Sequence, residues 1–430
     1  MSFYNRRLHT LSLCQALAGI QRGDISTVDL IHACYDQIEA REGQVGAWHF
    51  LLAREHYLEM YEAKRDFYDS SRLKGLPIGI KDIIDTATMP TEMGSQIHVG
   101  RRPLADASCV TLLQNAGAIV PGKTVTTEFA YFKAGKTVNP QDFLRTPGGS
   151  SSGSAAAVAD FMVPAALGSQ TAASVIRPAA YCGVVGYVGT CGEYSLRGVQ
   201  PLAQSLDSLG LLARSVEDIG LLRSVLLNRA QIAPTLHKPR RILICPGANV
   251  GDTDPAMVDA MIRMTQAIQD QGVETEELDS CDLLKQLVIY HHKILAYEAF
   301  RNLNEEAQQL DKVSPQFRDL MLLGQTLNHA EYLSALESVH KIGHWLWTHH
   351  SGFDAILAPA APGVAPKGLE STGQPHMSRP WQALGLPVIT LPGQVDDDGM
   401  PLGVQLVGKA RQDDILIDLA CWAEGILKLG

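Results

Sequence analysis

The chain has 430 residues, 46% of them hydrophobic, and a mean hydropathy near zero, as in an ordinary soluble globular protein. Its formal net charge is −10 at pH 7, and no cluster of Lys and Arg offers the basic surface that a nucleic-acid partner requires. The eight cysteines are scattered without metal-ligand spacing, no apolar run approaches the length of a membrane span, and no signal peptide is recognisable. We therefore expect a cytoplasmic protein with reduced thiols, no metal, no nucleic-acid partner and no membrane association.

Hydrophobic spacing predicts the elements of the first half of the chain. Helices are expected at 10–21, 26–39, 110–115 and 216–227, and a buried helix is expected to begin at Ala155. The second of these helices has a capping-box-like start at 26–29. Short apolar runs predict strands at 75–84, 118–120 and 183–187.

The second half restarts after a polar, Pro-bearing segment at 230–240. A strand, a helix and a strand are predicted next, either at the edge of the same sheet or in a second lobe, at 242–245, 255–271 and 272–276. Residues 283–350 are long, helical and charged, and the histidine pairs 291–292 and 349–350 are interpreted as surface residues. Three strands and a final helix follow, at 354–359, 386–391, 402–407 and from Asp414. The alternation of strands and helices indicates an α/β protein.

Two runs of small residues, 146–158 and 168–178, stand out in the middle of the chain. Gly and Ser disfavour helix and strand interiors, because Gly loses much backbone freedom on ordering and Ser competes for backbone hydrogen bonds. One alternative is a flexible Gly/Ser linker. The apolar sequence around both runs instead favours loops in which N–H groups and hydroxyls come close to a ligand.

These runs resemble the signature of the amidase signature family, serine hydrolases that cleave C–N amide bonds. The matching segments are 148–159, 167–179 and, upstream, the lysine motif at 75–82. Further similar segments extend the resemblance over most of the chain. It implies an α/β fold with a large mixed β-sheet covered by helices on both sides, in a single domain over 1–430. The catalytic core is expected at about 70–225 and a C-terminal portion at about 240–430.

The resemblance assigns a Ser-Ser-Lys triad to Lys81, Ser150 and Ser174. Ser174 matches the nucleophile, and Ser150 matches a bridging serine that is held by a cis peptide bond and relays a proton to the lysine. A lysine can act as a base when desolvation lowers its pKa, and Lys81 lies within an apolar stretch. From the local sequence alone, an ion pair of Lys81 with Asp82 or Asp85 is the favoured interpretation, and the Ser-rich runs and the resemblance reverse that order.

The segment before the nucleophile matches the family's oxyanion hole, formed by backbone N–H groups at Thr171, Ala172 and Ala173. The family commonly has Gly-Gly where this chain has two alanines, and an alanine at positive φ would be strained. Ser151 matches a supporting hydroxyl, and we assign it to substrate binding. The sequence thus predicts a complete catalytic set and leaves the alignment of the oxyanion hole open.

Arg177 carries the most information about the substrate. It lies three residues after Ser174, where the same Ser-Val-Ile-Arg-Pro sequence in relatives places an arginine that binds the acid group of small substrates. A guanidinium can hold a carboxylate through two parallel hydrogen bonds. We therefore expect a small amide that carries a carboxylate, such as a malonamate-like, carboxyurea or carboxybiuret compound. The alternative is an arginine paired with a structural Asp or Glu.

Two other motifs point to different chemistry. Residues 117–124 match the phosphate-loop pattern G-x-x-x-x-G-K-T, but their apolar interior predicts a strand, so we reject a nucleotide site. Residues 149–153 match the nucleophile elbow G-x-S-x-G, in which Ser151 would attack with Asp354 and His376 as partners. No apolar strand precedes this second motif, which makes it the weaker hypothesis.

The sequence as a whole predicts an amidase that forms an acyl-enzyme and uses neither metal nor organic cofactor. Its partner is a small-molecule amide, and a homodimer or a small partner subunit remains open. One alternative is the glutamine-hydrolysing subunit of an amidotransferase, which passes ammonia to a partner. The other is a catalytically silent binding subunit, suggested by the alanines at 172 and 173.

Overall fold

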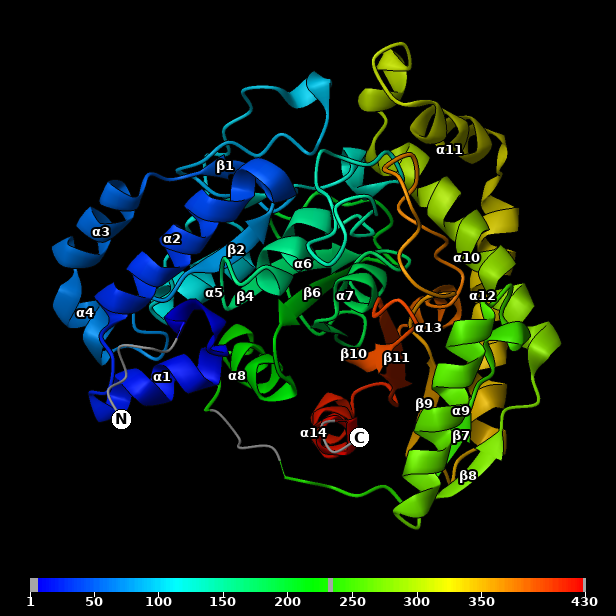
Figure 1. Cartoon of the computed structure of the whole chain (residues 1–430). Helices are drawn as coiled ribbons and strands as arrows, with labels where there is room; N and C mark the ends of the chain where they lie inside the picture. The colour runs from blue at the N-terminus through cyan, green and yellow to red at the C-terminus, as the bar shows by residue number, and fades with distance from the viewer. Residues whose placement is uncertain (1–6, 231–234, 428–430) are drawn as a thin grey trace.

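In the residues that the computed structural model describes, 7–230 and 235–427, eleven strands form one mixed sheet (Figure 1). The strands are β1 (Trp48–Leu51), β2 (Ile78–Lys81), β3 (Gly122–Thr124), β4 (Ala165–Gln170), β5 (Val185–Val188), β6 (Ser208–Ala213), β7 (Arg241–Ile244), β8 (Glu274–Glu277), β9 (Ala355–Pro359), β10 (Val388–Val395) and β11 (Pro401–Val407). Their order across the sheet is β1-β3-β2-β4-β6-β5-β10-β11-β9-β7-β8.

The sheet combines parallel and antiparallel pairs. β2 runs parallel to both β3 and β4, whereas β4 is antiparallel to β6, and β10 is antiparallel to β5 and β11. At the other end, β7 runs parallel to β8 and β9. The restart after residue 240 therefore extends the edge of the same sheet, and the expectation of a mixed sheet is confirmed.

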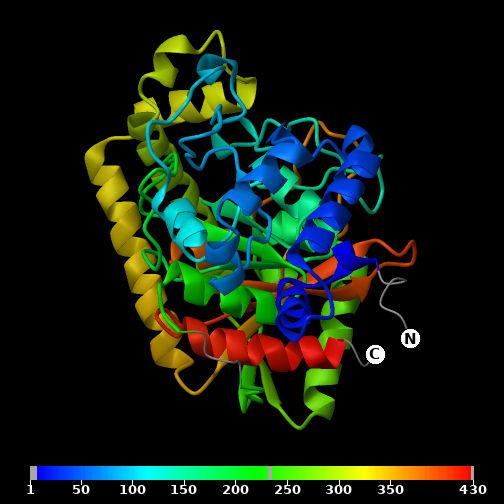
Figure 2. The ribbon, with the colours of Figure 1, turned by 90° about the vertical axis from the view of Figure 1, so that its left-hand side faces the viewer.

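Helices cover both faces of the sheet. They are α1 (Leu13–Arg22), α2 (Thr27–Val45), α3 (Arg54–Ala63), α4 (Arg65–Ser70), α5 (Ser108–Asn115), α6 (Ser152–Ala159), α7 (Ile176–Cys182), α8 (Val216–Leu226), α9 (Pro255–Asp270), α10 (Cys281–Asn302), α11 (Pro315–Thr326), α12 (His329–His349), α13 (Arg379–Ala383) and α14 (Asp413–Leu427). α8 and α14 pack under the central strands, and α6 and α7 pack on the opposite face (Figure 1). The view in Figure 2 shows α14, in red, lying beneath the sheet.

Most of the expected helices and strands are present, with bounds that differ by a few residues from those expected. The capping box of α2 is present: the N–H of Asp29 donates to Ser26 Oγ over 3.1 Å, and the N–H of Ser26 donates to the Asp29 carboxylate over 3.3 Å. The predicted strand at 118–120 is wrong. Ile119 forms only an isolated bridge with Pro77, and the strand of this region is β3, two residues further on.

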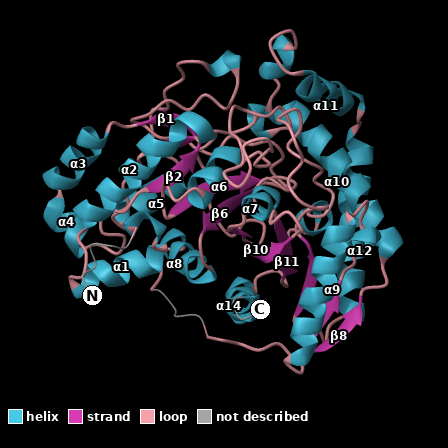
Figure 3. Cartoon of the chain, in the orientation of Figure 1, coloured by secondary structure: helices cyan, strands magenta, loops and turns pink. Residues whose placement is uncertain are grey.

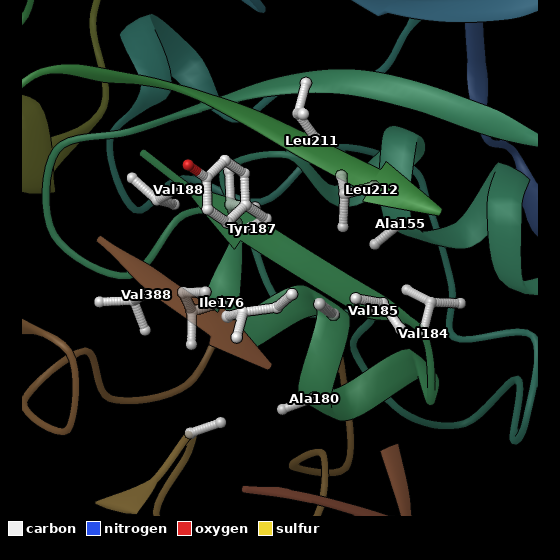
Figure 4. Packing of buried hydrophobic residues seen from close by; sticks show 14 of the residues in the cluster. Ala155, Ile176, Ala180, Val184, Val185, Tyr187, Val188, Leu211, Leu212 and Val388 are labelled. Atoms are coloured by element: carbon white, nitrogen blue, oxygen red, sulfur yellow. The ribbon is translucent and has the colours of Figure 1, made fainter. Parts of the chain in front are cut away.

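Helix α7 anchors the second Gly/Ser-rich run to the sheet. Figure 4 shows Ile176 and Ala180 of α7 close to Val185 of β5 and Val388 of β10. All four side chains are buried, and β5 and β10 are neighbouring strands. The loop that leads into α7 is therefore held in place by close packing of buried apolar side chains.

In the described part of the chain, no helix has the length and apolar character needed to cross a membrane.

Candidate active site

Lys81 is the last residue of β2 and lies at the carboxyl end of a parallel strand pair. Its neighbour β4 runs alongside in register, with Ile80 opposite Leu167, so the end of β4 reaches the same place. Lys81 Nζ lies 2.6 Å from Ser150 Oγ and 3.0 Å from Ser169 Oγ, and it also donates to the carbonyl oxygen of Ser169 over 3.3 Å. The lysine is completely buried.

Lys81 has no carboxylate partner among the described residues. Asp82 instead lies 3.2 Å from Lys123, and Asp85 pairs with Arg101 over 2.7 Å, so the ion pair expected from local sequence is wrong. Burial lowers the pKa of Lys81 well below its ordinary value, and the more distant charge of Asp207 opposes that shift only in part. Burial thus favours the neutral amine, the form that can accept a proton.

The peptide bond between Gly149 and Ser150 is cis, as the resemblance implied. Two backbone hydrogen bonds hold this segment: the N–H of Thr127 donates to the carbonyl oxygen of Ser150 over 3.3 Å, and the N–H of Ser151 donates to that of Ser174 over 3.1 Å. The second bond joins the loop of Ser150, the expected bridging serine, directly to the loop of Ser174, the expected nucleophile.

Ser174 lies in the turn between β4 and α7. The side-chain oxygen of Gln170 accepts hydrogen bonds from the N–H groups of Val175 and Ile176, over 2.9 and 3.1 Å, and so closes this turn. The hydroxyl of Ser174 makes no hydrogen bond to any described residue, and the side chain faces a pocket. It is therefore available for a substrate.

The backbone before Ser174 presents unused donors. Among the described residues, no group accepts a hydrogen bond from the N–H of Thr171, Ala172, Ala173 or Ser174, and all four residues line the pocket. Neither alanine has a positive φ, so the strain considered for them does not arise. Backbone donors without partners beside a pocket-lining serine have the arrangement that an oxyanion hole requires.

The side chains of His291 and Asp207 hold Thr171, the first residue of the segment 171–174. The imidazole Nε2 of His291 on α10 lies 2.7 Å from the carbonyl oxygen of Thr171, and the hydroxyl of Thr171 donates to Asp207 over 2.5 Å. Burial lowers the pKa of His291 to about 3, so the imidazole is neutral and Nε2 carries the donated hydrogen. Burial also raises the pKa of Asp207 to about 7.

The pocket in front of these groups is small, and its described lining carries two arginines, Arg177 and Arg379, and no carboxylate. Figure 3 shows loops gathered between α6, α7 and α10. The lining residues are Thr127, Ala130, Tyr131, Phe132, Ser150, Thr171, Ala172, Ala173, Ser174, Arg177, Leu202, Leu295, Thr372, Pro375 and Arg379. Lys81 lies behind Ser150 and reaches the pocket only through that hydroxyl.

Arg177 is buried and lines the pocket, but its guanidinium is engaged by the protein. Nη1 donates to the carbonyl oxygen of Gly373 over 2.6 Å, and Nη2 donates to the carbonyl oxygen of Gly149 over 2.6 Å and to Thr372 Oγ1 over 3.1 Å. Burial lowers its pKa to about 10. Arg177 forms no ion pair with a described Asp or Glu, so the alternative of a structural acid partner is wrong; backbone oxygens take that place.

Ser151 does not line the pocket. It is fully buried, and its hydroxyl contacts the end of β4, donating to the carbonyl oxygen of Ser169 over 3.3 Å. The structure thus gives Ser151 a positioning role instead of the expected contact with substrate. The elbow hypothesis is also wrong, because His376 contacts the carbonyl oxygen of Asp252 and Asp354 accepts from the N–H of Arg240.

The segment 117–124, which matches the phosphate-loop pattern, contains a strand of the sheet. Residues 122–124 form β3, and Lys123 is completely buried, with its amine 2.6 Å from the hydroxyl of Thr91. Within the described ranges, no three His, Cys, Asp or Glu side chains form a group that could hold a metal ion.

Sequence reasoning missed several residues of the site, among them Ser169, His291 and Arg379. Ser169 contacts Lys81, and its place beside a strand end in the second Gly/Ser run was the available signal. His291 is buried and contacts the carbonyl oxygen of Thr171, so its interpretation as a surface histidine is wrong; the sequence of its helix gave no indication of this contact. Arg379 enters the pocket from a segment that carries no motif.

A family model described as Amidase matches residues 29–417. A glutamyl-tRNA(Gln) amidotransferase subunit from Picosynechococcus sp. is 31% identical to this chain, over 92% of the chain and 93% of the relative. The corresponding protein of Roseiflexus sp. is 30% identical, over 95% of each protein. A crystal structure of an amidase superposes with a TM-score of 0.87 at 27% identity, covering 96% of this chain and 99% of the other.

The breadth of the family match and the shared fold define an enzyme class that acts on carbon–nitrogen bonds. The chain belongs to the amidase family, which carries the amidase signature.

Proposed function

We propose that this protein hydrolyses the C–N bond of a small, carboxylate-bearing amide through Lys81, Ser150 and Ser174. The observation that carries the proposal is the buried lysine, which has no acid partner among the described residues and lies 2.6 Å from the bridging hydroxyl. A neutral amine in contact with a serine can act as general base, and a serine relay extends its reach to the pocket.

The proposed reaction has two stages. Ser174 Oγ attacks the amide carbon while its proton passes through Ser150 to Lys81, and the N–H groups of residues 171–174 stabilise the resulting oxyanion. The proton then returns through Ser150 to the leaving nitrogen, the C–N bond breaks and ammonia or an amine departs. Water, activated by the same relay, hydrolyses the acyl ester and releases the acid with free Ser174.

The substrate class is inferred from the charges of the pocket. Its two cationic side chains, Arg177 and Arg379, favour an anionic substrate, and its limited size favours a short one. No metal or organic cofactor takes part in this proposal. The protein acts on a small molecule, and a homodimer or a small partner subunit is compatible with it.

A second candidate is the role named for the relatives, an amidotransferase subunit that takes ammonia from an amide. Glutamine differs from glutaramate only by its α-ammonium group, and the described pocket lining offers no carboxylate to pair with that group. The structure of the pocket therefore favours glutaramate and shorter acid amides such as malonamate over glutamine.

The test is ammonia release from malonamate, glutaramate, glutamine and the neutral malonamide. We expect release from the acid amides and a loss of at least about 1,000-fold in Ser174→Ala, as for other removed nucleophiles. Ser334→Ala, an exposed serine on α12, is the matched control and should keep full activity. A fluorophosphonate that labels the wild type but not Ser174→Ala identifies the nucleophile independently. An unlabelled and inactive wild type would establish the silent binding subunit instead.

A further inference from the structure

Arg379 is a positive charge without a partner among the described residues. It is the first residue of α13 and is partly buried on the wall of the pocket. Its guanidinium forms no hydrogen bond and no ion pair with any described residue, and its Nε is buried without an acceptor. Proteins seldom bury part of a cation in this way, because the lost hydration is costly unless an anion or an acceptor replaces it.

The other arginine of the pocket, Arg177, shares the buried Nε without an acceptor but differs at its terminal nitrogens. Both terminal nitrogens of Arg177 already donate to protein oxygens, at Gly149, Thr372 and Gly373. These bonds connect the loop of the bridging serine to the loop that precedes α13. Arg177 therefore adds positive charge to the pocket, while three of its five N–H donors hold the two loops.

The charge of Arg379 acts on its neighbours in the pocket. Burial raises the pKa of the neighbouring Tyr131 phenol, and the charge of Arg379 opposes that rise. Burial lowers the pKa of Arg379 itself, with Tyr131 opposing the shift. Arg379 also adds to the lowering of the pKa of Arg177 and His291, which indicates that its charge reaches across the pocket. None of the lining residues is acidic.

We propose that Arg379 is the residue that binds the substrate carboxylate through its free guanidinium edge, and that Arg177 positions the loops beside it. The inference rests on the proposed function, since it names the specificity residue of that site. A planar guanidinium can bind a carboxylate through two parallel hydrogen bonds, which fixes the acid group as well as attracting it. The amide at the other end of a short substrate then has one orientation available, toward Ser174.

The test compares malonamate with malonamide, which replaces the carboxylate by a neutral amide of the same shape. We expect Arg379→Gln to lower kcat/KM for malonamate about 30-fold, mainly through KM, because one charged hydrogen-bonding pair is lost. Malonamide should change by less than about 3-fold. Arg263→Gln, an exposed arginine on α9, makes the same charge change far from the site and should keep the wild-type preference.

Binding of malonate, measured by calorimetry, separates this inference from the proposed reaction. If Ser174 resists the fluorophosphonate and no amide is hydrolysed, the proposed function fails, and malonate still reports on Arg379. We expect Arg379→Gln to weaken malonate binding at least about 10-fold. A variant that binds malonate as tightly as the wild type, or keeps the wild-type preference for malonamate, overturns the inference.

A folding defect in Arg379→Gln would show in thermal unfolding. Arg379→Lys is then the informative variant, because it keeps the charge and a long aliphatic stem but loses the planar fork. Malonate should bind Arg379→Lys about 3- to 10-fold more weakly than the wild type. Unchanged affinity in this variant would also overturn the inference.

Discussion

The pKa of Lys81 determines the pH at which the proposed reaction can run, and Ser169 offers a way to change it. An unshifted lysine, with an ordinary pKa of 10.5, would carry a neutral amine in only about one molecule in 1,000 at pH 7.5. Complete burial without an acid partner lowers the pKa, so we expect kcat/KM to be level at neutral pH. It should fall about tenfold per pH unit once the pH drops below the pKa of Lys81.

The perturbation is Ser169→Asp, which places a carboxylate where a hydroxyl now lies 3.0 Å from Lys81 Nζ. Opposite charges about 4 Å apart attract by about 4 kcal/mol at an effective dielectric constant of 20, or about three pH units. The carboxylate's own burial reduces this gain, and we expect the acid limb of the kcat/KM profile to move up by about two units. At a pH on that limb, activity should fall about 100-fold and recover at higher pH.

The matched control is Ser169→Asn, which has nearly the same shape as the aspartate and no charge. Its acid limb should coincide with that of the wild type, whatever the change in the level of activity. The assay is ammonia release from malonamate between pH 5 and 10. If Ser169→Asp and Ser169→Asn show the same limb, Lys81 is not the group that titrates, and the reasoning from its burial is refuted.

Two predictions concern the stability of the protein at His291 and Gly153, residues that support the site. His291 has a folded pKa of about 3 against an ordinary 6.5, so its stabilising effect is complete above pH 6.5 and is lost as the pH falls toward 3. We therefore measure the free energy of unfolding by denaturant titration at pH 7.5 and at pH 5. Between these two pH values, the free energy of unfolding of the wild type should fall by about 2 kcal/mol more than that of His291→Gln, and equal decreases would contradict this. Gly153→Ala should destabilise the protein by about 3 kcal/mol, because a Cβ there would lie 2.2 Å from the carbonyl oxygen of Ala47. An unchanged denaturation midpoint would show that the backbone at this position yields easily.

The sequence predicted those parts of the site that lie in its motifs. The loop prediction for the two runs is right at 146–151 and 171–175 and wrong for the rest, because helix packing against the sheet makes Ser152–Ala159 part of α6 despite its Gly and Ser. The apolar neighbours of Lys81 mark a buried lysine, which can be recognised locally. The capping box of α2 and the strand–helix alternation are local in the same sense. The expected mixed sheet with helices on both faces came from the resemblance and is confirmed.

The remaining parts depend on contacts between distant segments. Ser169 meets Lys81 because β2 and β4 pair in parallel, across a separation of 88 residues, and no local pattern specifies that pairing. His291 reaches Thr171 across 120 residues, and its burial depends on how α10 packs over the loop. The ion pair expected for Lys81 failed for a similar reason, since Asp82 faces Lys123 on the neighbouring strand β3.

The charges of the pocket also separate the two candidate reactions within the family. A substrate ammonium placed about 6 Å from a guanidinium would be repelled by about 3 kcal/mol at an effective dielectric constant of 20, and Arg177 and Arg379 both line this pocket. Glutamine carries such an ammonium and glutaramate does not, so we expect kcat/KM for glutaramate to exceed that for glutamine at least about 100-fold. Comparable values for the two substrates would mean that the pocket neutralises the ammonium, and the amidotransferase role would then become the better explanation.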